Sequence, residues 1–434
     1  MPDCGGSGLL KDGSGMPRSH SLRDVFSMRS AVATWAGPLA LLTLGVAALL
    51  LQAAPGDYET AAVDAGPVIA AIVAGHPGSL FTMQPLMGSF SVVLRVPFAL
   101  VATLAGGGEK AVYLAGVLPC LLAAGAFGVW LVARRPEPAR YLLAVPLLAV
   151  LTPAALDAVQ TGHPEEILGG VLCAAAVILA PRRAVCAGLA LGLALATKQW
   201  AVIAIVPVLA GCRAGRRVTA AVVAGAVWLL FELPLAVGSS SAFSRVAQQA
   251  TIASAHVSRA NLWFLISHPV RLHLDVPSGF RSEATEYVIP SSISSHSHAL
   301  IVALAAALAL LGWWRRANPL AILALGLLLR CVLEPDNVEY YHAPFLLALL
   351  AYEVTARRDV RGLPAMTLFS VFGLWLTFNV LDAHHVDPHL VNGVYLAWTA
   401  IAAAYLILAS GLVRIPAFRP RRLQTPRTST AQTH

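Results

Sequence analysis

Long apolar runs separated by short polar segments constrain the fold of this chain more than any other sequence feature. Only 12% of the 434 residues are charged, against about 25% in an ordinary soluble domain. Mean hydropathy is +0.71, so the runs must face lipid, where unpaired backbone groups are costly and each run is predicted to be helical. The runs cover roughly 31–54, 86–105, 111–133, 141–156, 166–181, 184–197, 200–212, 218–237, 299–314, 318–333, 343–356, 363–381 and 391–413.

Basic residues lie in short clusters between the runs and indicate how the runs are oriented. The net charge of +8 could suit nucleic acid, but clusters of this kind are the positive-inside pattern of membrane proteins, and no nucleic-acid partner is predicted. We therefore predict a multi-pass cell-membrane protein with every cluster in the cytoplasm. The clusters are Arg134/Arg135/Arg140, Arg182/Arg183, Arg213/Arg216/Arg217, Arg315/Arg316, Arg357/Arg358/Arg361 and 414–427.

Placing every cluster in the cytoplasm sets two conditions. Runs 86–105 and 111–133 cannot both cross the bilayer, because Arg134 and Arg135 would then lie outside. Run 86–105 carries Arg95 and Pro97, which favours an interfacial or re-entrant helix. Residues 184–212 have arginine on both flanks and must go out and back, with arms of about 13 residues that are shorter than the ~30 Å apolar core. Their apex, 197–200, is expected in a recess, and two short helices meeting at a polar apex indicate a binding site.

The predicted architecture is an all-α transmembrane bundle of about twelve spans, with outer-face loops and an interfacial helix. Residues 1–30 are predicted to be a disordered cytoplasmic leader, 31–413 the membrane domain, and 414–434 a basic cytoplasmic tail. The six cysteines are scattered without a C-x-x-C pair, which disfavours a disulfide framework or zinc site. No metal and no cofactor are predicted, although His384 and its neighbours could in principle ligate a metal.

Polar residues that are unusual for a membrane protein gather on the predicted outer side. Asp57 and Asp64 follow the first run, and either could act as a general base. A lysine or arginine at membrane depth is costly unless it meets water or an anion. The residues predicted to contact substrate are Arg95, Gln160, His163, Glu165, Glu166, Lys198, Arg330, Asp336, Tyr340 and His342.

Several of these residues also have purely structural interpretations. Glu165 and Glu166 could simply complement the N-terminal dipole of the helix that they begin. Arg330 could pair with Glu334 or Asp336. The functional interpretation is that Lys198 and Arg330 share one anion. Cations at this depth suit a lipid phosphate whose tail stays in the bilayer, and an opposing carboxylate suits proton removal from an attacking hydroxyl.

The early aspartate, the polar loop at 157–165 and the segment GLALGLALATKQWA at 188–201 resemble the GT-C membrane glycosyltransferases. The resemblance is to the actinobacterial polyprenol-phosphate-mannose-dependent mannosyltransferases in particular, and it spans roughly 31–413. It implies a mannosyltransferase with a polyprenyl-phosphate sugar donor and a lipid or cell-wall glycan acceptor on the extracytoplasmic face. Asp64 or Asp57 would then be the base, with Lys198 and Arg330 on the donor phosphate.

A transporter or flippase of a lipid-linked sugar is the main alternative, because many spans and a broken helix pair would suit it. The gathering of polar residues on one face disfavours alternating access, which needs ionisable groups on both halves. A non-catalytic membrane scaffold is a third hypothesis, and it would tolerate alanine at Asp64 and Lys198 alike.

Overall fold

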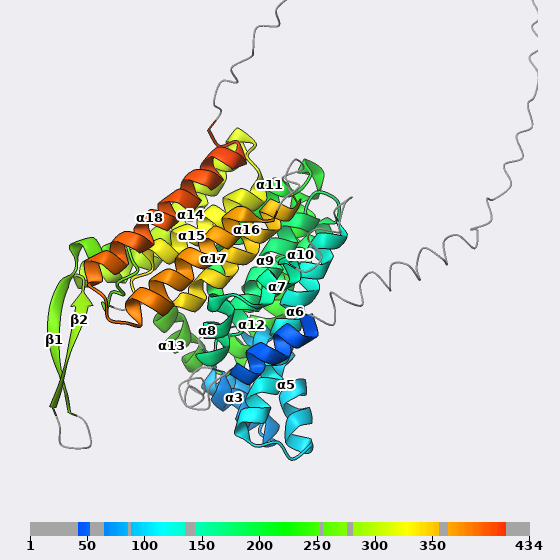
Figure 1. The fold of residues 1–434 in the computed structure, drawn as a ribbon. Coiled ribbons are helices and arrows are strands. Elements are labelled where there is room, and N and C mark those ends of the chain that lie inside the picture. The colour runs from blue at the N-terminus through cyan, green and yellow to red at the C-terminus, as the bar shows by residue number, and fades with distance from the viewer. Residues whose placement is uncertain are drawn as a thin grey trace, which may run out of the picture.

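The computed structural model describes residues 42–52, 65–85, 88–134, 144–251, 255–275, 281–355 and 363–413, which are almost entirely helical (Figure 1). The prediction of an all-α membrane bundle is confirmed in outline. In chain order the helices are Leu42–Gln52, α3 (Gly66–Val73), α4 (Ser79–Met83), α5 (Ser89–Leu104), α6 (Glu109–Ala133), α7 (Ala144–Val150), α8 (Pro153–Gln160), α9 (Glu165–Leu179), α10 (Ala184–Leu195), η1 (Gln199–Ala204), α11 (Ile205–Gly211), η2 (Ala214–Arg216), α12 (Arg217–Gly238), α13 (Ser240–Thr251), η3 (Trp263–Ile266), α14 (Ser291–Arg315), α15 (Pro319–Leu333), η4 (Glu339–His342), α16 (Ala343–Thr355), α17 (Ala365–Trp375), the π-helix η5 (Leu376–Asp382) and α18 (Pro388–Ser410).

Five helical stretches in the described part of the chain are long and apolar enough to cross a membrane. They are Glu109–Ala133, Ala214–Gly238, Ser291–Arg315, Ala365–Asp382 and Pro388–Ser410. The other apolar helices are shorter, so a total of about twelve crossings stays a prediction. One expected run, 141–156, is divided, because α7 ends at Val150 and Thr152 caps a new helix by accepting a hydrogen bond from the Ala155 amide.

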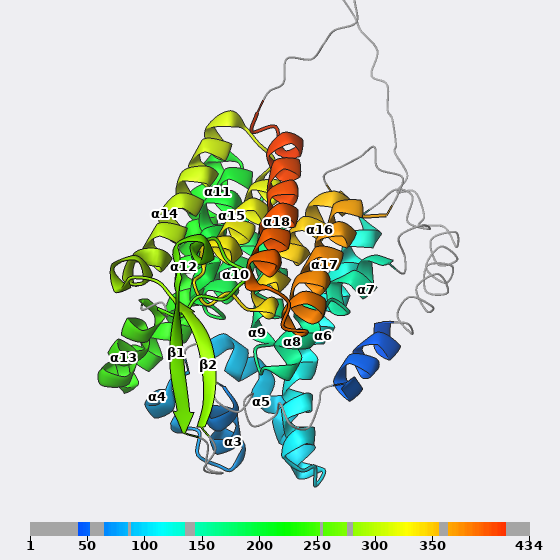
Figure 2. The same cartoon turned by 60° about the vertical axis from the view of Figure 1, so that its left-hand side comes forward.

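The bundle has two chemically different ends (Figure 2). The hairpin end, defined by α3, α13 and the strands β1 (His268–Asp275) and β2 (Arg281–Val288), lies at the bottom of that view. At the opposite, basic end the Arg216 guanidinium donates to the Arg182 carbonyl (3.2 Å), and the Arg217 guanidinium covers the Trp313 ring (4.5 Å). Arginines predicted to share one membrane face therefore lie together.

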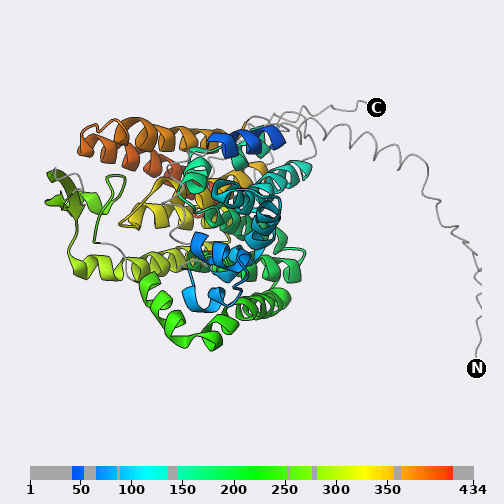
Figure 3. The ribbon, with the colours of Figure 1, turned by 90° about the horizontal axis from the view of Figure 1, so that it is seen from below.

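Three central helices, α9, α15 and α16, form the buried core between flanking helices. Every residue of α16 from Ala343 to Val354 is buried. Helices α9 and α16 approach closely at Gly170, where an added Cβ would lie 2.7 Å from the Pro344 Cα. In Figure 3 the orange and red helices α17 and α18 lie on one side of the bundle, and the green helices α12 and α13 on the other. The core thus holds the beginning of α9 rigidly.

The out-and-back segment breaks where the sequence predicts. Helix α10 ends at Leu195, Lys198 is extended (φ −151°, ψ 139°), and a 3-10 helix begins at Gln199. The start of α5 docks on this apex: the Gly88 amide donates to the Thr197 carbonyl (2.9 Å), and the Phe90 amide donates to the Ala196 carbonyl (3.0 Å). These bonds satisfy amides that a helix N-terminus leaves unpaired, and they fix α5 against the apex.

The antiparallel hairpin β1–β2 was not anticipated, because it lies between the apolar runs 218–237 and 299–314, where the sequence carries no apolar-run signal. Its strands pair from His268 with Val288 to Asp275 with Arg281. The base of the hairpin is anchored by the Val257 amide, which donates to the Tyr287 carbonyl (2.8 Å). Hence part of the segment between these two runs is an ordered structure.

The contact between α5 and the apex leaves no room for a side chain at Gly88, where a Cβ would lie 2.1 Å from the Ala196 oxygen. We expect Gly88→Ala to lower stability by about 1–3 kcal/mol, as overpacking does, in a thermal-unfolding measurement in detergent. Gly225→Ala is the matched control, because nothing lies within 4 Å of a Cβ there. Equal melting temperatures for the two variants would contradict the close contact.

Candidate active site

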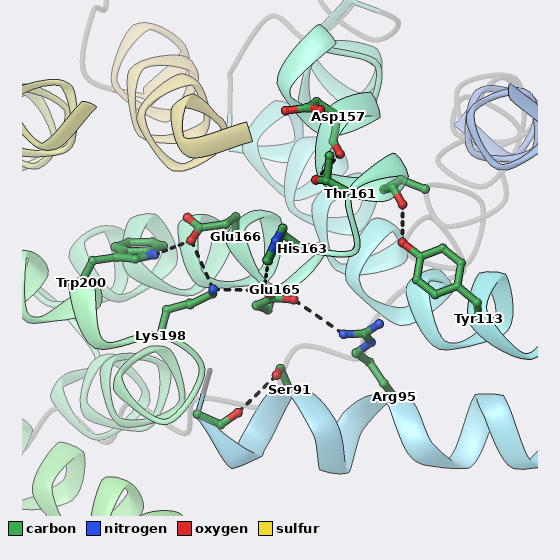
Figure 4. Close-up of polar contacts among 12 residues, drawn as sticks. Ser91, Arg95, Tyr113, Asp157, Thr161, His163, Glu165, Glu166, Lys198 and Trp200 are labelled. Atoms are coloured by element: carbon green, nitrogen blue, oxygen red, sulfur yellow. Dashed lines mark hydrogen bonds and ion pairs between the residues drawn. The ribbon is translucent and has the colours of Figure 1, made fainter. Parts of the chain in front are cut away.

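Two consecutive glutamates in the first turn of α9 form the centre of the site. Glu165 and Glu166 are 0% and 1% exposed, after the helix begins at the N-cap residue Pro164. Both glutamates therefore lie where the structural interpretation placed them, in the first turn of a helix, where carboxylates are favoured. Each carboxylate also meets cations from distant parts of the chain, as Figure 4 shows.

Glu166 is held by a bidentate ion pair with Arg330. The two terminal guanidinium nitrogens of Arg330 lie 3.1 Å and 3.4 Å from its two oxygens, and the Trp200 indole N–H donates to it at 3.0 Å. The predicted structural alternative, an ion pair of Arg330 with Glu334 or Asp336, is wrong, because the ion pair forms with Glu166. Arg330 of α15 pairs with Glu166 because the buried N-terminus of α9 faces α15 across the core.

Arg330 is also enclosed by aromatic rings. Its guanidinium lies 4.9 Å from the Trp200 ring centroid and 4.5 Å from that of Tyr341, within the range of cation–π attraction. Only 7% of the side chain is exposed. Arg330 is therefore fully engaged by the protein itself.

Glu165 contacts a second group of basic side chains. Its carboxylate lies 3.1 Å from the Lys198 Nζ, 3.2 Å from the His163 Nδ1 and 3.6 Å from the Arg95 Nη1. The Lys198 Nζ also lies 3.6 Å from Glu166, so this lysine bridges the two carboxylates. The predicted site residues on α5, the loop before α9, the apex and α15 thus converge on one point, hereafter the charge cluster.

The charge cluster brings Arg95, Lys198 and Arg330 to the two glutamates at one buried point. Cations at membrane depth are costly unless they meet water or an anion. A cluster of this kind is suited to hold an anionic group of a ligand.

A layer of loop residues adjoins the charge cluster through His163. The His163 ring stacks on Tyr340 with centroids 4.4 Å apart. The Tyr340 amide donates to the Asp157 Oδ2 (3.0 Å), which joins the segments 157–165 and 334–342. Two loops that the sequence placed on the same face are in contact.

Glu339 is a carboxyl group whose proton affinity is altered by this layer. Burial, together with the nearby Asp157 carboxylate, raises the pKa of Glu339 to about 8. The Asn379 side-chain amide donates to its Oε1 at 2.7 Å and partly opposes the shift. Glu339 was not singled out from the sequence, because nothing local signals its proximity to Asp157.

Other predicted substrate residues lie away from the charge cluster. His342 faces the Tyr395 hydroxyl (3.1 Å from Nε2), and burial lowers its pKa to about 4, which keeps it neutral. Gln160 ends α8, and Asp336 is exposed in the loop before η4. Neither makes a hydrogen bond to the cluster residues within the described ranges. Trp200 and Tyr341 were missed as site residues, although the polar apex beside Trp200 was a signal.

The two candidate bases, Asp57 and Asp64, lie outside the described residues. The residue after Asp64 is described: Ala65 is fully buried and packs in a small cluster with Val92 of α5. This brings the chain that follows Asp64 onto the helix that carries Arg95. No group of three or more metal-capable side chains occurs within the described part of the chain.

The sequence model of glycosyltransferase family 87 matches residues 86–335, which is more than half of the chain. The chain belongs to glycosyltransferase family 87. The matched region begins just before α5 and ends just after α15, so it contains the whole charge cluster. The residues of the cluster are Arg95, His163, Glu165, Glu166, Lys198 and Arg330. None of the curated proteins and none of the solved structures compared with this family 87 chain matches it.

Glu339 should make stability depend on pH. Because its pKa in the folded protein lies above the ordinary value of 4.5, its stabilising contribution is complete below pH 4.5 and is lost as pH rises to about 8. Glu339→Gln should therefore flatten the fall of melting temperature over that window, measured by tryptophan fluorescence in detergent. Asp157→Asn should move the window to lower pH. Parallel curves for wild type and Glu339→Gln would rule out this assignment.

Proposed function

We propose that this chain transfers a sugar, mannose by its resemblance, from a polyprenyl-phosphate donor to a lipid or cell-wall glycan acceptor. The observation that carries the proposal is the convergence of Arg95, Lys198 and Arg330 at one buried point within the region matched by family 87. A sugar joined to a lipid through one phosphate is a phosphodiester, and its negative charge suits a site lined by these cations.

The two ends of the bundle support a proposal for the side of the membrane on which the site lies. The arginines Arg182, Arg216 and Arg217 gather at the basic end, which the positive-inside rule assigns to the cytoplasm. The charge cluster lies at the start of α9, the end of that helix opposite to Arg182, and adjoins the loops 157–165 and 334–342. We therefore propose an extracytoplasmic active site, with both termini of the chain in the cytoplasm.

The proposed reaction needs one base and one charged site for the leaving group. The acceptor hydroxyl attacks the anomeric carbon of the donor sugar, and the base takes its proton as the bond from that carbon to the phosphate oxygen breaks. The departing polyprenyl phosphate gains negative charge, which fixed cations stabilise without proton transfer. The charge cluster supplies these cations.

Asp64 is the proposed base, with Asp57 as the other candidate. The burial of Ala65 against α5 supports Asp64, because it draws the chain towards the helix that carries Arg95. A carboxylate near such packing is partly desolvated, which raises its proton affinity towards the working range of a base. Asp57 lies farther from this contact along the chain.

A transporter of the same lipid-linked sugar remains the second candidate, because the apex at Lys198 does break a short helical pair. Family 87 membership supports transfer instead. The gathering of Arg95, Lys198 and Arg330 in one cluster also supports a single fixed site.

Transfer and transport are separated by supplying labelled polyprenyl-phosphate mannose to membranes that contain the protein. We expect label in acceptor glycans, with Asp64→Asn slowing transfer by about 10²–10⁴, and Asp57→Asn far less. The reverse ranking would move the base to Asp57. Full activity in both variants would remove the first loop from the chemistry, and label entering vesicles without transfer would establish a transporter.

Cysteine labelling tests the orientation. In a background without native cysteines, Gln199→Cys at the exposed apex should react with a membrane-impermeant reagent added from outside. Arg182→Cys and Ala214→Cys, on the flanks of the segment, should be protected until the membrane is opened. External labelling of Ala214→Cys would overturn the proposed topology.

A further inference from the structure

Arg95 is the one cation of the charge cluster whose guanidinium retains unpaired nitrogens among the described residues. The residue is 1% exposed and reaches from α5 towards Glu165 (Figure 4). Its single ion pair is long, 3.6 Å from Nη1 to the Glu165 Oε2. Its Nε and Nη1 have no hydrogen-bond partner within the described residues, and neither has the facing Glu165 Oε2.

Such unpaired atoms are unusual, because buried donors in folded proteins almost always have a partner. Gly116 of α6 borders the Arg95 side chain, since an added Cβ there would lie 3.8 Å from the Arg95 Nε, an ordinary contact distance. Two buried donor nitrogens of one guanidinium without acceptors indicate a place for anionic oxygen atoms.

Arg330 offers the opposite situation. Its guanidinium is paired in a bidentate way with Glu166, and the rings of Trp200 and Tyr341 lie close to it. A phosphate could bind Arg330 only by displacing Glu166, which would leave that carboxylate without its principal partner in a buried position.

We propose that Arg95 and Lys198 bind the phosphate of the lipid donor, with Glu165 as the resident counter-ion that the phosphate competes with, while Arg330 positions Glu166 and the aromatic rings without touching it. This assignment rests on the proposed function for the nature of the donor. The two non-bridging oxygens of a phosphodiester give one acceptor for each cation. It differs from the sequence-based prediction, in which Lys198 and Arg330 share the phosphate.

Glu165 has a distinct part in this arrangement. Its carboxylate lies 3.1 Å from Lys198 and 3.6 Å from Arg95, so it occupies the field of both cations before an anion arrives. The bound phosphate then shares these cations with Glu165, and their mutual repulsion limits its affinity. Removing the charge of Glu165 should therefore strengthen phosphate binding, which no merely structural role would produce.

The test is binding of methyl farnesyl phosphate, a monoanionic phosphodiester without a sugar, to the full-length protein in lipid nanodiscs, measured by calorimetry. We expect Arg95→Gln to weaken binding about 10- to 100-fold, as loss of a charge-assisted hydrogen bond does. Arg259→Gln is the matched control, because Arg259 pairs with Asp382 at 2.8 Å outside the charge cluster and should bind the probe as wild type does. Arg330→Lys should lower the melting temperature but change the affinity by less than about threefold, because the proposed site does not touch it.

Wild-type affinity in a folded Arg95→Gln variant overturns the inference, as does absence of probe binding by the wild type. If Arg95→Gln fails to insert or fold, Glu165→Gln decides: tighter binding by about tenfold supports the inference, and unchanged or weaker binding overturns it. Because the probe has no sugar to transfer, these results are separate from the transfer assay. If the wild type transfers sugar but Arg95→Gln leaves probe affinity unchanged, only this assignment is refuted. If Arg95→Gln weakens probe binding but the wild type transfers no sugar, only the proposed function is refuted.

Discussion

The two buried carboxylates at the start of α9 are the interaction on which the rest of this structure depends. A buried carboxylate must be paired, so Glu165 and Glu166 require cations to reach them. Those cations come from α5, from the apex between α10 and η1, and from α15, which are distant in sequence. Pairing therefore draws three parts of the chain to one end of α9 and stabilises a lysine at an apex that lipid alone would not tolerate.

Glu165 and Glu166 divide the charge cluster into a half with complete pairing and a half with unpaired atoms. Glu166, Arg330 and Trp200 are joined by short, well-oriented contacts, and α15 and α9 hold them against the most buried helix of the bundle. Glu165 and Arg95 face each other across a longer gap with unpaired atoms on both sides. A site that stabilises developing charge needs this combination, because fixed donors avoid reorganisation while donors without acceptors can still bind the ligand.

Local signals explain which parts of this arrangement could be predicted from the sequence. The length of an apolar run and the positions of arginines can be read along the sequence without knowledge of tertiary contacts. The helices and the break at Lys198 were therefore predicted well. The partner of Arg330 was not, because Glu166 lies 164 residues away and only tertiary packing brings the two together. The β1–β2 hairpin was missed for a different reason: its strands lie inside a long polar segment, where the apolar-run criterion is silent. The bases Asp57 and Asp64 lie outside the described residues, and their roles stay predictions.

Stability alone does not account for three cations around two carboxylates. Replacing a buried ion pair by well-packed apolar residues is often neutral or stabilising. A buried donor left without an acceptor, as on Arg95, costs about 1–3 kcal/mol. A chain that needed only to close this end of the bundle could have omitted Arg95, since Glu165 already meets Lys198 at 3.1 Å. Local departures from stable packing are expected where function requires them. The extra arginine, with its unpaired nitrogens on the helix that follows the proposed base, is therefore best explained by an anion that binds there during the reaction.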